Sequence, residues 1–341
     1  MAAHQGTPPR ARRLWMAVAG SAAAAALVAV GAGWWVLGPV GGGEARVVVI
    51  PSGASAWAIG RQLRDAGLVR APVSLVAAAA LQRRLGTLQP GEYVFHPSQS
   101  AWEIAGRIAR GAVRLHRVTV PEGYTVRQIA DLLAGMGLVD RDRFLDLALR
   151  QGRTLGRPWL DALPSDSLEG YLFPDTYYLP RGLREEAVIG TMLDRFEAAV
   201  GESLRAAAAA RGLGLHDLVT VASMVEREAQ VPDERPVIAG VIYNRLARGM
   251  RLEIDATVLY ALGYHKPVVT AADLAVDSPY NTYRRAGLPP GPIASPGVAA
   301  LEAAAHPAAV PYLYYVRRPD GRHHFSRTFA EHLDAVRRYR P

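Results

Sequence analysis

The stretch Val120-Pro121-Glu122-Gly123 through Gly137-Leu138-Val139 matches an earlier stretch, Ile50-Pro51-Ser52-Gly53 through Gly67-Leu68-Val69, at a constant offset of 70 residues. Each copy reads as a strand, a Pro-x-Gly turn and an amphipathic helix. In the second copy the apolar residues following the turn fall at helical spacing, and Gly137 stands where a left-handed cap would end the helix. The repeat therefore predicts an α+β fold for this part of the chain.

Short strand-turn-helix units of this kind resemble LysM-like modules, which bind chains that contain N-acetylglucosamine. The alternative is an ordinary small α/β packing unit, and the repeat alone does not choose between them. A third partial copy strengthens the repeat, since Ser100-Ala101-Trp102-Glu103-Ile104 matches Ser55-Ala56-Trp57-Ala58-Ile59. We assign residues 46–158 to this LysM-like region and residues 159–341 to a mixed α+β domain after it.

The N-terminus carries an uncharged run of 24 residues from Leu14 to Leu37. At 1.5 Å per residue this run spans about 36 Å, enough to cross a hydrocarbon core. Arginines precede it and a Gly-rich linker follows at 38–45, so the positive-inside rule predicts a cytoplasmic tail at 1–13, a transmembrane helix at 14–37 and an exported remainder. The alternative is a cleaved signal peptide, but the run exceeds the usual length and no small-x-small cleavage site follows it.

The composition excludes several classes of protein. The absence of cysteine removes thiol nucleophiles, cysteine-ligated zinc and disulfides. The net charge of +8 is not gathered into a Lys/Arg-rich run interleaved with aromatic residues, so no nucleic-acid partner is expected. The nine histidines show no metal-binding spacing, and neither a Gly-x-Ser-x-Gly nor a His-Glu-x-x-His motif is present. We expect neither a metal nor a cofactor.

The second half of the chain is rich in residues that bind sugars. Twelve of the fourteen tyrosines lie at or beyond Tyr171, and phenol rings with nearby amides and carboxylates suit a polar, aromatic glycan cleft. Tyr312 to Val316 and His323 to Ser326 are predicted instead to form a hairpin around Pro319-Asp320-Gly321, so the tyrosines of this segment are interpreted as strand residues.

A helix is predicted between His216 and Gln230, with its apolar residues on one face. At about 100° per residue, Glu226 lies beside that face, where partial burial would raise the pKa of its carboxyl and suit it to act as a general acid. The alternative is a helix-boundary glutamate paired with an arginine. Glu228 flanks the opposite side of the stripe, so the two carboxyls are not expected to face one substrate.

Several motifs resemble those of the endolytic murein transglycosylase family, also described as MltG or YceG-like. They cover nearly the whole exported chain, in the family's order. The motifs are Leu168-Glu169-Gly170-Tyr171-Leu172-Phe173-Pro174-Asp175-Thr176-Tyr177, Ala222-Ser223-Met224-Val225-Glu226-Arg227-Glu228-Ala229, Tyr243-Asn244-Arg245-Leu246, Asp255-Ala256-Thr257-Val258-Leu259-Tyr260, Tyr280-Asn281-Thr282-Tyr283, Gly287-Leu288-Pro289-Pro290-Gly291 and Ser295-Pro296-Gly297.

The resemblance implies a lytic transglycosylase, a lyase that cuts the bond between N-acetylmuramic acid and N-acetylglucosamine in nascent peptidoglycan and leaves 1,6-anhydro ends. It implies Glu226 as the catalytic residue, with residues 159–341 as the catalytic domain. One departure is Ser295, where the family often carries asparagine. The residues expected to bind sugar are Asn244, Tyr280, Asn281, Tyr283, Tyr171 and Ser295; those expected to support the site are Glu169, Asp175, Glu228, Arg245 and Asp255.

The resemblance also implies a place in the cell. A single-pass protein of the inner (cytoplasmic) membrane, with its catalytic domain on the outer side, would cut strands close to the bilayer as they are polymerised and so terminate them. Its expected partners are the glycan strands, and peptidoglycan synthases or proteins of the division and elongation machineries.

Two other functions remain open from the sequence. A muramidase would use Glu226 together with a second carboxylate, such as Asp175 or Asp255, to activate water. A non-catalytic scaffold would bind glycan through the repeats and recruit cell-wall synthases.

Overall fold

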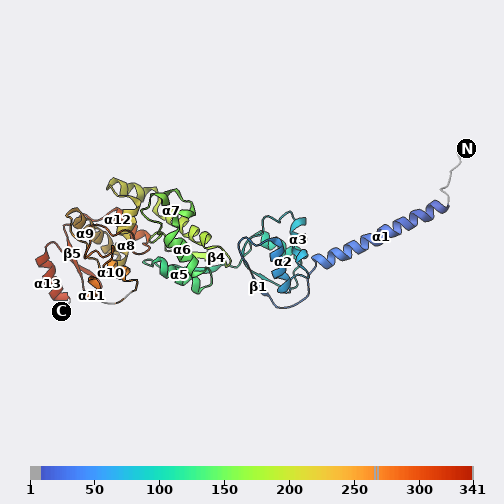
Figure 1. Cartoon of the computed structure of the whole chain (residues 1–341), viewed down its shortest axis with the longest axis horizontal. Coiled ribbons are helices and arrows are strands. Elements are labelled where there is room, and N and C mark those ends of the chain that lie inside the picture. Colours follow the sequence, from blue (N-terminus) through green and yellow to red (C-terminus); the bar gives the residue numbers. More distant parts are fainter. Residues whose placement is uncertain (1–8, 265, 267–268, 340–341) are drawn as a thin grey trace. The chain divides into compact units, whose positions relative to one another are not determined.

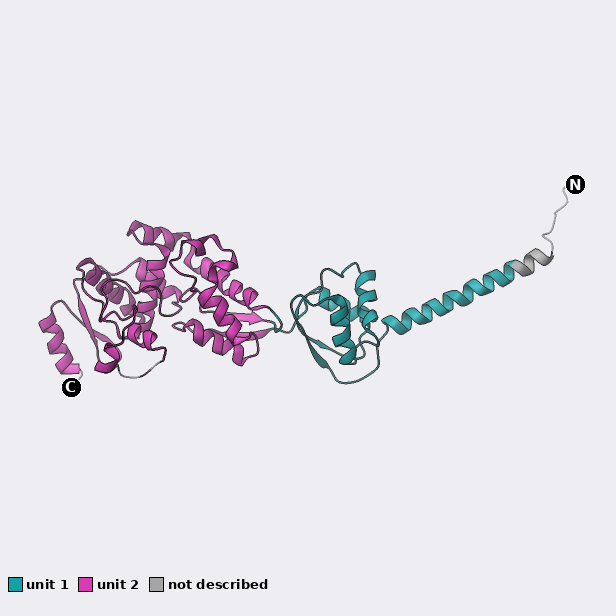
Figure 2. Cartoon of the chain, in the orientation of Figure 1, with its two compact units in different colours: residues 1–115, 180–183 teal, residues 116–179, 184–341 magenta. Residues whose placement is uncertain are grey.

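The computed structural model describes residues 9–339 except 265, 267 and 268. The described chain is a mixed α+β structure, as predicted (Figure 1). It divides into two compact units, shown in Figure 2. Unit 1 comprises the described residues up to 115 together with 180–183, and unit 2 comprises 116–179 and the described residues from 184 onward.

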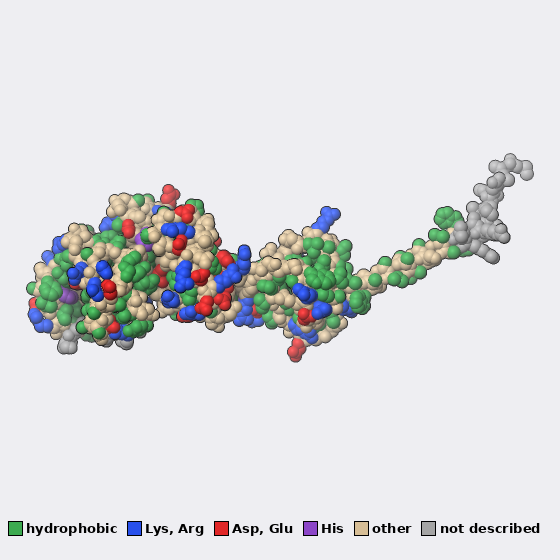
Figure 3. All heavy atoms as spheres, in the orientation of Figure 1, with side chains coloured by type: hydrophobic (Ala, Val, Ile, Leu, Met, Phe, Trp, Pro, Cys, Tyr) green, Lys and Arg blue, Asp and Glu red, His purple; other side chains and the backbone are tan. Residues whose placement is uncertain are grey.

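The first helix, α1 (Pro9–Leu37), contains the predicted membrane segment. Its part Trp15–Leu37 is 23 residues long, has a mean hydropathy of 1.8 and is not buried by other parts of the chain. Among the described residues this is the one helix that is long and apolar enough to cross a membrane. In Figure 3 its side chains are apolar or small along this part.

The rest of unit 1 is a strand-helix-helix-strand unit followed by one more helix. Strands β1 and β2 pair antiparallel, with Arg46 opposite Phe95 and Ile50 opposite Gly91. The side chain of Ser55 accepts the N–H of Ala58 and so begins the first helix. Apolar side chains from all of these elements form one core. The elements are β1 (Arg46–Ile50), α2 (Ala56–Asp65), α3 (Pro72–Leu81), β2 (Gly91–Phe95) and α4 (Ala101–Ala109).

Unit 2 begins with the second copy of the repeat, which has the same order of elements. Its strands pair antiparallel, with His116 opposite Leu179 and Thr119 opposite Thr176. Gly137 has a positive φ of 67°, as predicted for the residue that ends the first helix. The structure adds a second helix and a closing strand to each predicted copy. The elements are β3 (His116–Thr119), α5 (Val126–Gly135), α6 (Arg141–Arg150) and β4 (Thr176–Leu179).

The two copies of the repeat belong to different compact units. The region 46–158, predicted to be one LysM-like region, is shared between unit 1, which includes its residues up to Leu115, and unit 2. The second copy packs with the C-terminal part of the chain, since its helix α6 contacts the long helix after β4.

The remaining elements are η1 (Gly152–Leu155), η2 (Pro158–Ala162), α7 (Glu185–Ala210), α8 (Leu215–Glu228), η3 (Pro232–Glu234), α9 (Arg235–Ala247), α10 (Asp255–Leu262), α11 (Ala271–Leu274), α12 (Val298–Ala305), β5 (Tyr314–Arg317), β6 (His323–Ser326) and α13 (Phe329–Tyr339), where η denotes a 3₁₀ helix.

Helix α8 is the centre of unit 2 and confirms the helix predicted between His216 and Gln230. It packs against α7, α9, α10 and α12. Every residue from Leu218 to Val225 is buried, so the helix is enclosed on all sides rather than on one apolar face. Two hydroxyls make this possible by bonding within the helix: Thr220 Oγ1 donates to the His216 carbonyl at 2.7 Å, and Ser223 Oγ donates to the Thr220 carbonyl at 2.8 Å.

The predicted C-terminal hairpin is also confirmed. Strands β5 and β6 pair antiparallel, with Tyr314 opposite Ser326 and Arg317 opposite His323. The turn between them contains Gly321, which has a positive φ of 82°.

Candidate functional site

Glu226 lies in the last turn of α8, and its side chain is 7 % exposed. Its Oε2 accepts the backbone N–H of Gly297 at 3.1 Å. Its Oε1 lies 3.4 Å from Nη2 of Arg235, at the start of α9. The partial burial predicted for this carboxyl is confirmed. The arginine pairing that was the alternative is also present, although the distance is long for an ion pair between a guanidinium and a carboxylate.

Two loops bring backbone rather than side chains next to Glu226. The N–H of Gly123 donates to the Ser295 carbonyl at 2.8 Å, and the N–H of Ser295 donates to the Tyr124 carbonyl at 2.8 Å. This pairing joins the turn after β3 to the segment before α12. Gly123 has a φ of 76°, and a Cβ added there would come within 3.8 Å of Cγ of Glu226. Glycine therefore allows the turn its positive φ, and this turn lies against the side chain of Glu226.

A second carboxyl, that of Glu122, lies in the same place and was not predicted. It packs over Gly297, because a Cβ added to Gly297 would overlap the Glu122 carboxyl. Burial and the nearby Glu226 carboxylate raise the pKa of Glu122, and Arg235 opposes them. One signal in the sequence could have revealed it: the matched turns differ at this position, with Ser52 in the first copy and Glu122 in the second.

A polar cavity of about 450 Å³ lies beside Glu228. Oε2 of Glu228 accepts the hydroxyl of Tyr315 at 3.1 Å, and Tyr283 donates to Oδ1 of Asp255 at 2.6 Å. Burial, with a smaller contribution from the Asp255 charge, raises the pKa of Glu228 to about 7. Arg227 lines this cavity and also donates from Nη1 to the Gly123 carbonyl at 3.2 Å, so it connects the cavity with the loops around Glu226.

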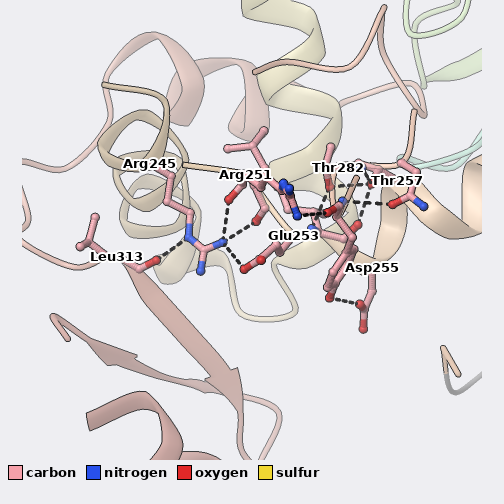
Figure 4. A network of polar contacts seen from close by, with 11 residues as sticks. Arg245, Arg251, Glu253, Asp255, Thr257, Thr282 and Leu313 are labelled. Atoms are coloured by element: carbon pink, nitrogen blue, oxygen red, sulfur yellow. Dashed lines mark hydrogen bonds and ion pairs between the residues drawn. The ribbon is translucent and has the colours of Figure 1, made fainter. Parts of the chain in front are cut away.

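Arg245 braces one wall of this cavity (Figure 4). Its Nε donates to the Leu313 carbonyl at 2.6 Å, and its Nη1 donates to the carbonyls of Leu252 at 2.9 Å and Arg251 at 3.0 Å. The same Nη1 pairs with Glu253 at 3.1 Å. Glu253 has a φ of 52°, which non-glycine residues rarely adopt, and these contacts hold it there.

Comparisons with known proteins identify relatives of this chain. The model of the YceG-like family matches residues 48–338, which is most of the chain. The chain belongs to the YceG-like family. This confirms the resemblance drawn from the sequence motifs.

Relatives of this YceG-like chain carry a common name. A protein of Bacillus subtilis (strain 168) named endolytic murein transglycosylase is 33 % identical over 309 residues, which cover 85 % of this chain and 83 % of that protein. A protein of the same name from Streptococcus pneumoniae (strain D39) is 33 % identical over 303 residues, covering 79 % of this chain and 53 % of that protein. The crystal structure of a protein described as yceG-like, from Listeria monocytogenes, has a TM-score of 0.59 at 32 % identity and covers 86 % of this chain and 99 % of that one.

Three of the residues expected to bind sugar are enclosed in this YceG-like fold, and their role in sugar binding stays a prediction. Tyr171, Asn281 and Ser295 are at most 1 % exposed. Asn281 Nδ2 donates to the carbonyls of Leu274 at 2.9 Å and Val276 at 2.8 Å, so it holds the preceding loop. Ser295 contributes its backbone N–H and carbonyl to the loop pairing beside Glu226. Its buried hydroxyl has no hydrogen-bond partner within the described part of the chain.

The hydroxyl of Tyr171 holds a loop rather than a ligand. It lies 2.8 Å from Nδ1 of His216, whose Nε2 lies 2.9 Å from the Pro290 carbonyl. A carbonyl can only accept, so Nε2 carries the proton and Nδ1 accepts from the tyrosine. The chain of bonds ties the Gly287–Pro292 segment to the start of α8.

Asn244, also expected to bind sugar, uses its amide in the same way. Its Nδ2 donates to the carbonyls of Val310 at 2.7 Å and Tyr312 at 3.0 Å, which braces the segment before β5. Tyr283 lines the cavity beside Glu228, and Tyr280 is partly exposed, with its ring 4.8 Å from that of Tyr260. A role in sugar binding for these two tyrosines stays a prediction.

Glu169 and Asp175, which were expected to support the site, each accept hydrogen bonds from neighbouring parts of the fold. Oε1 of buried Glu169 accepts the N–H of Val126 at 3.0 Å, at the first turn of α5, and burial raises the pKa of this glutamate to about 7. Asp175 accepts the N–H of Thr176 at 2.7 Å and pairs with Nε of Arg195 at 2.5 Å. These hydrogen bonds lower the pKa of Asp175. Asp175 is therefore engaged with Thr176 and Arg195.

The raised pKa of Glu228 predicts how stability depends on pH. An unfolded glutamate has a pKa of about 4.3, so between about pH 4.3 and 7 the folded chain holds a proton that the unfolded chain releases. The free energy of unfolding should therefore fall as pH rises through this window, by up to about 4 kcal/mol for this group. In Glu228→Gln we expect a shallower fall between pH 5 and pH 8, measured by urea unfolding in detergent.

In Glu228→Gln, Glu169 still makes the free energy of unfolding fall with rising pH, because its pKa is also about 7. The matched control is Glu202→Gln on the exposed surface of α7, which should unfold with the wild-type pH dependence. Equal slopes for Glu228→Gln and the wild type would contradict the prediction.

Proposed function

We propose that this chain is a lytic transglycosylase that cuts the glycan strands of peptidoglycan with Glu226 as its acid and base. The observation that carries the proposal is the position of Glu226, a nearly buried carboxyl held by one backbone N–H and approached by glycine-lined loops. The name endolytic murein transglycosylase, shared by relatives that match most of the chain, supports the substrate class.

In the proposed reaction, the protonated carboxyl of Glu226 donates to the oxygen that links N-acetylmuramic acid to N-acetylglucosamine. The C1–O bond breaks while positive charge develops at C1 of the muramic residue. The Glu226 carboxylate then takes the proton of the C6 hydroxyl, and that oxygen bonds to C1. The products are a free N-acetylglucosamine hydroxyl and a 1,6-anhydro end. Because the attacking hydroxyl belongs to the same sugar, its orientation supplies much of the acceleration.

The contacts of Glu226 suit both steps of the reaction, the donation of a proton and its later uptake. The Gly297 N–H fixes Oε2 and stabilises the carboxylate left after donation. The Arg235 guanidinium attracts the same charge, but at 3.4 Å it does not close a short ion pair with Oε1. That oxygen can therefore exchange a proton with the sugar.

The first unit supports a second glycan contact. We propose that it is a LysM-like module, since its strand-helix-helix-strand order places two helices between paired strands. Trp57 and Trp102 stand at matching positions, two residues after the serines that cap α2 and α4, and are 53 % and 47 % exposed. Exposed indole rings offer flat apolar faces on which sugar rings stack.

The membrane segment supports the proposed location. With α1 as a single-pass anchor and the N-terminus in the cytoplasm, the enzyme lies outside the cytoplasmic membrane. Tethering restricts it to strands near the bilayer, which are those still being polymerised. Peptidoglycan synthases and proteins of the division and elongation machineries are the proposed neighbours.

The products of cleavage test the proposal. The full chain in detergent, incubated with uncrosslinked glycan strands, should yield fragments that end in 1,6-anhydro-N-acetylmuramic acid by mass spectrometry. Reducing ends, heavier by one water, would assign the chain to the hydrolases. Binding of strands without cleavage would support the scaffold.

A further inference from the structure

The turn that carries Glu122 does not need a glutamate. The matching turn of the first copy has the same Pro-x-Gly pattern with Ser52 in its place. The glycines of the two turns have nearly equal φ values, 80° at Gly53 and 76° at Gly123. Folding of the turn therefore does not explain why a carboxyl stands at position 122.

The neighbours of Glu122 place its carboxyl at the candidate site. The Gly123 and Tyr124 backbone is bonded on both sides of Ser295, at 2.8 Å each, which fixes the turn against the segment that leads to Gly297. The Glu122 carboxyl occupies the space that a side chain at Gly297 would fill. The N–H of the same Gly297 holds Glu226. Gly297 thus contacts both glutamates: the Glu122 carboxyl packs against its Cα, and the Glu226 carboxylate accepts its N–H.

Charged groups of both signs lie around the Glu122 and Glu226 carboxyls. Glu122 faces Glu226 from α8 and Arg235 from α9, and the guanidinium of Arg227 is bonded to the adjacent Gly123 carbonyl. Burial and the charge of Glu226 raise the pKa of Glu122. When two carboxyls interact in this way, they lose their protons in two steps that belong to the pair.

We propose that Glu122 is a positioning residue through which the two carboxyls of this site keep one proton between them, available for donation to the glycosidic oxygen. This inference rests on the proposed function of Glu226. Glu122 opposes the attraction of Arg235 for the Glu226 carboxylate, so that the site retains one proton for donation to the glycosidic oxygen. After donation, the C6 hydroxyl of the sugar returns a proton to Glu226 and the pair is restored.

The test is the pH profile of glycan cleavage by the full chain in detergent. Glu122→Gln removes one negative charge and keeps the shape of the side chain. The alkaline limb of kcat/KM should move to lower pH by about one unit, with about a tenfold loss of kcat above that limb and little change in KM. Glu202→Gln, an exposed glutamate of α7, is the matched control and should keep the wild-type profile.

Two further variants separate charge from folding. Glu122→Asp keeps the charge and should keep the alkaline limb near its wild-type position. Gly297→Ala has an ordinary backbone φ of −77° but displaces the Glu122 carboxyl, so it should shift the limb in the same direction as Glu122→Gln. Gly297→Ala also gives the answer if Glu122→Gln does not fold.

The outcomes distinguish this inference from the function itself. An unshifted limb in folded Glu122→Gln, or in Gly297→Ala if Glu122→Gln does not fold, would overturn the role of Glu122. A rise in KM alone would do the same. If the wild type releases no anhydro ends, or if Glu226→Gln retains cleavage, the proposed function fails instead.

Discussion

Glu226→Gln should abolish cleavage of peptidoglycan strands while leaving the fold intact. Glutamine has nearly the shape of glutamate and its carbonyl oxygen can still accept the Gly297 N–H, but it can neither donate nor retake the proton. Since one group acts as both acid and base, we expect a loss of at least about 10³-fold in kcat. The measurement is the rate of release of 1,6-anhydro ends by the full chain in detergent.

The matched variant is Glu228→Gln, two residues away on the same helix. Glu228 lines the cavity and has a pKa of about 7, so it is the structural rival for the acid. Oε2 of Glu228 accepts the Tyr315 hydroxyl, and the buried Glu228 carboxyl lies near the Asp255 charge. These contacts indicate a supporting role. Loss of cleavage in Glu228→Gln together with retention in Glu226→Gln would transfer the catalytic role to Glu228. In cells, full function of Glu226→Gln would support the scaffold alternative.

Arg245→Met should destabilise unit 2 more than any exposed substitution. The change removes the donors for the carbonyls of Arg251, Leu252 and Leu313 and leaves these acceptors without the bonds that satisfy them. We expect a loss of about 3 kcal/mol or more, which lowers the midpoint of thermal unfolding by about 10 °C. The measurement is calorimetric unfolding of the full chain in detergent.

Arg248→Met is the control for this prediction, because Arg248 ends the same helix and is exposed. It should unfold within about 1 °C of the wild type. Arg245→Lys should fall between the two, since one ammonium group cannot reach all three carbonyls. A wild-type midpoint for Arg245→Met would show that the network in Figure 4 does not stabilise the fold.

The predictions from the sequence succeeded where they depended on local pattern. The spacing of apolar residues located α5 and α8, Gly137 marked the end of a helix, and the hairpin of β5 and β6 was indicated by its turn. The second helix of each repeat was missed, because only the first part of each copy matches in sequence. The two copies also pack with different neighbours, which their matching sequences do not indicate.

The polar residues of the site were harder to predict. Composition identified residues that could bind sugar, but an asparagine that braces a loop has the same chemistry as one that contacts a glycan. Only burial separates them, as for Asn281, and burial depends on segments distant in the sequence. Glu122 was missed because its role arises from the approach of the Gly297 segment, 175 positions further along the chain.

The two copies of the repeat place different chemical groups at the same position of the turn. In the second copy, the residue between proline and glycine is Glu122, whose carboxyl borders Glu226, so a substitution there changes the charge beside that carboxyl. In the first copy the same position carries a serine, whose hydroxyl is no acid or base at neutral pH. A duplicated module can in this way become part of an active centre in one copy, while its twin stays free to diversify toward other ligands.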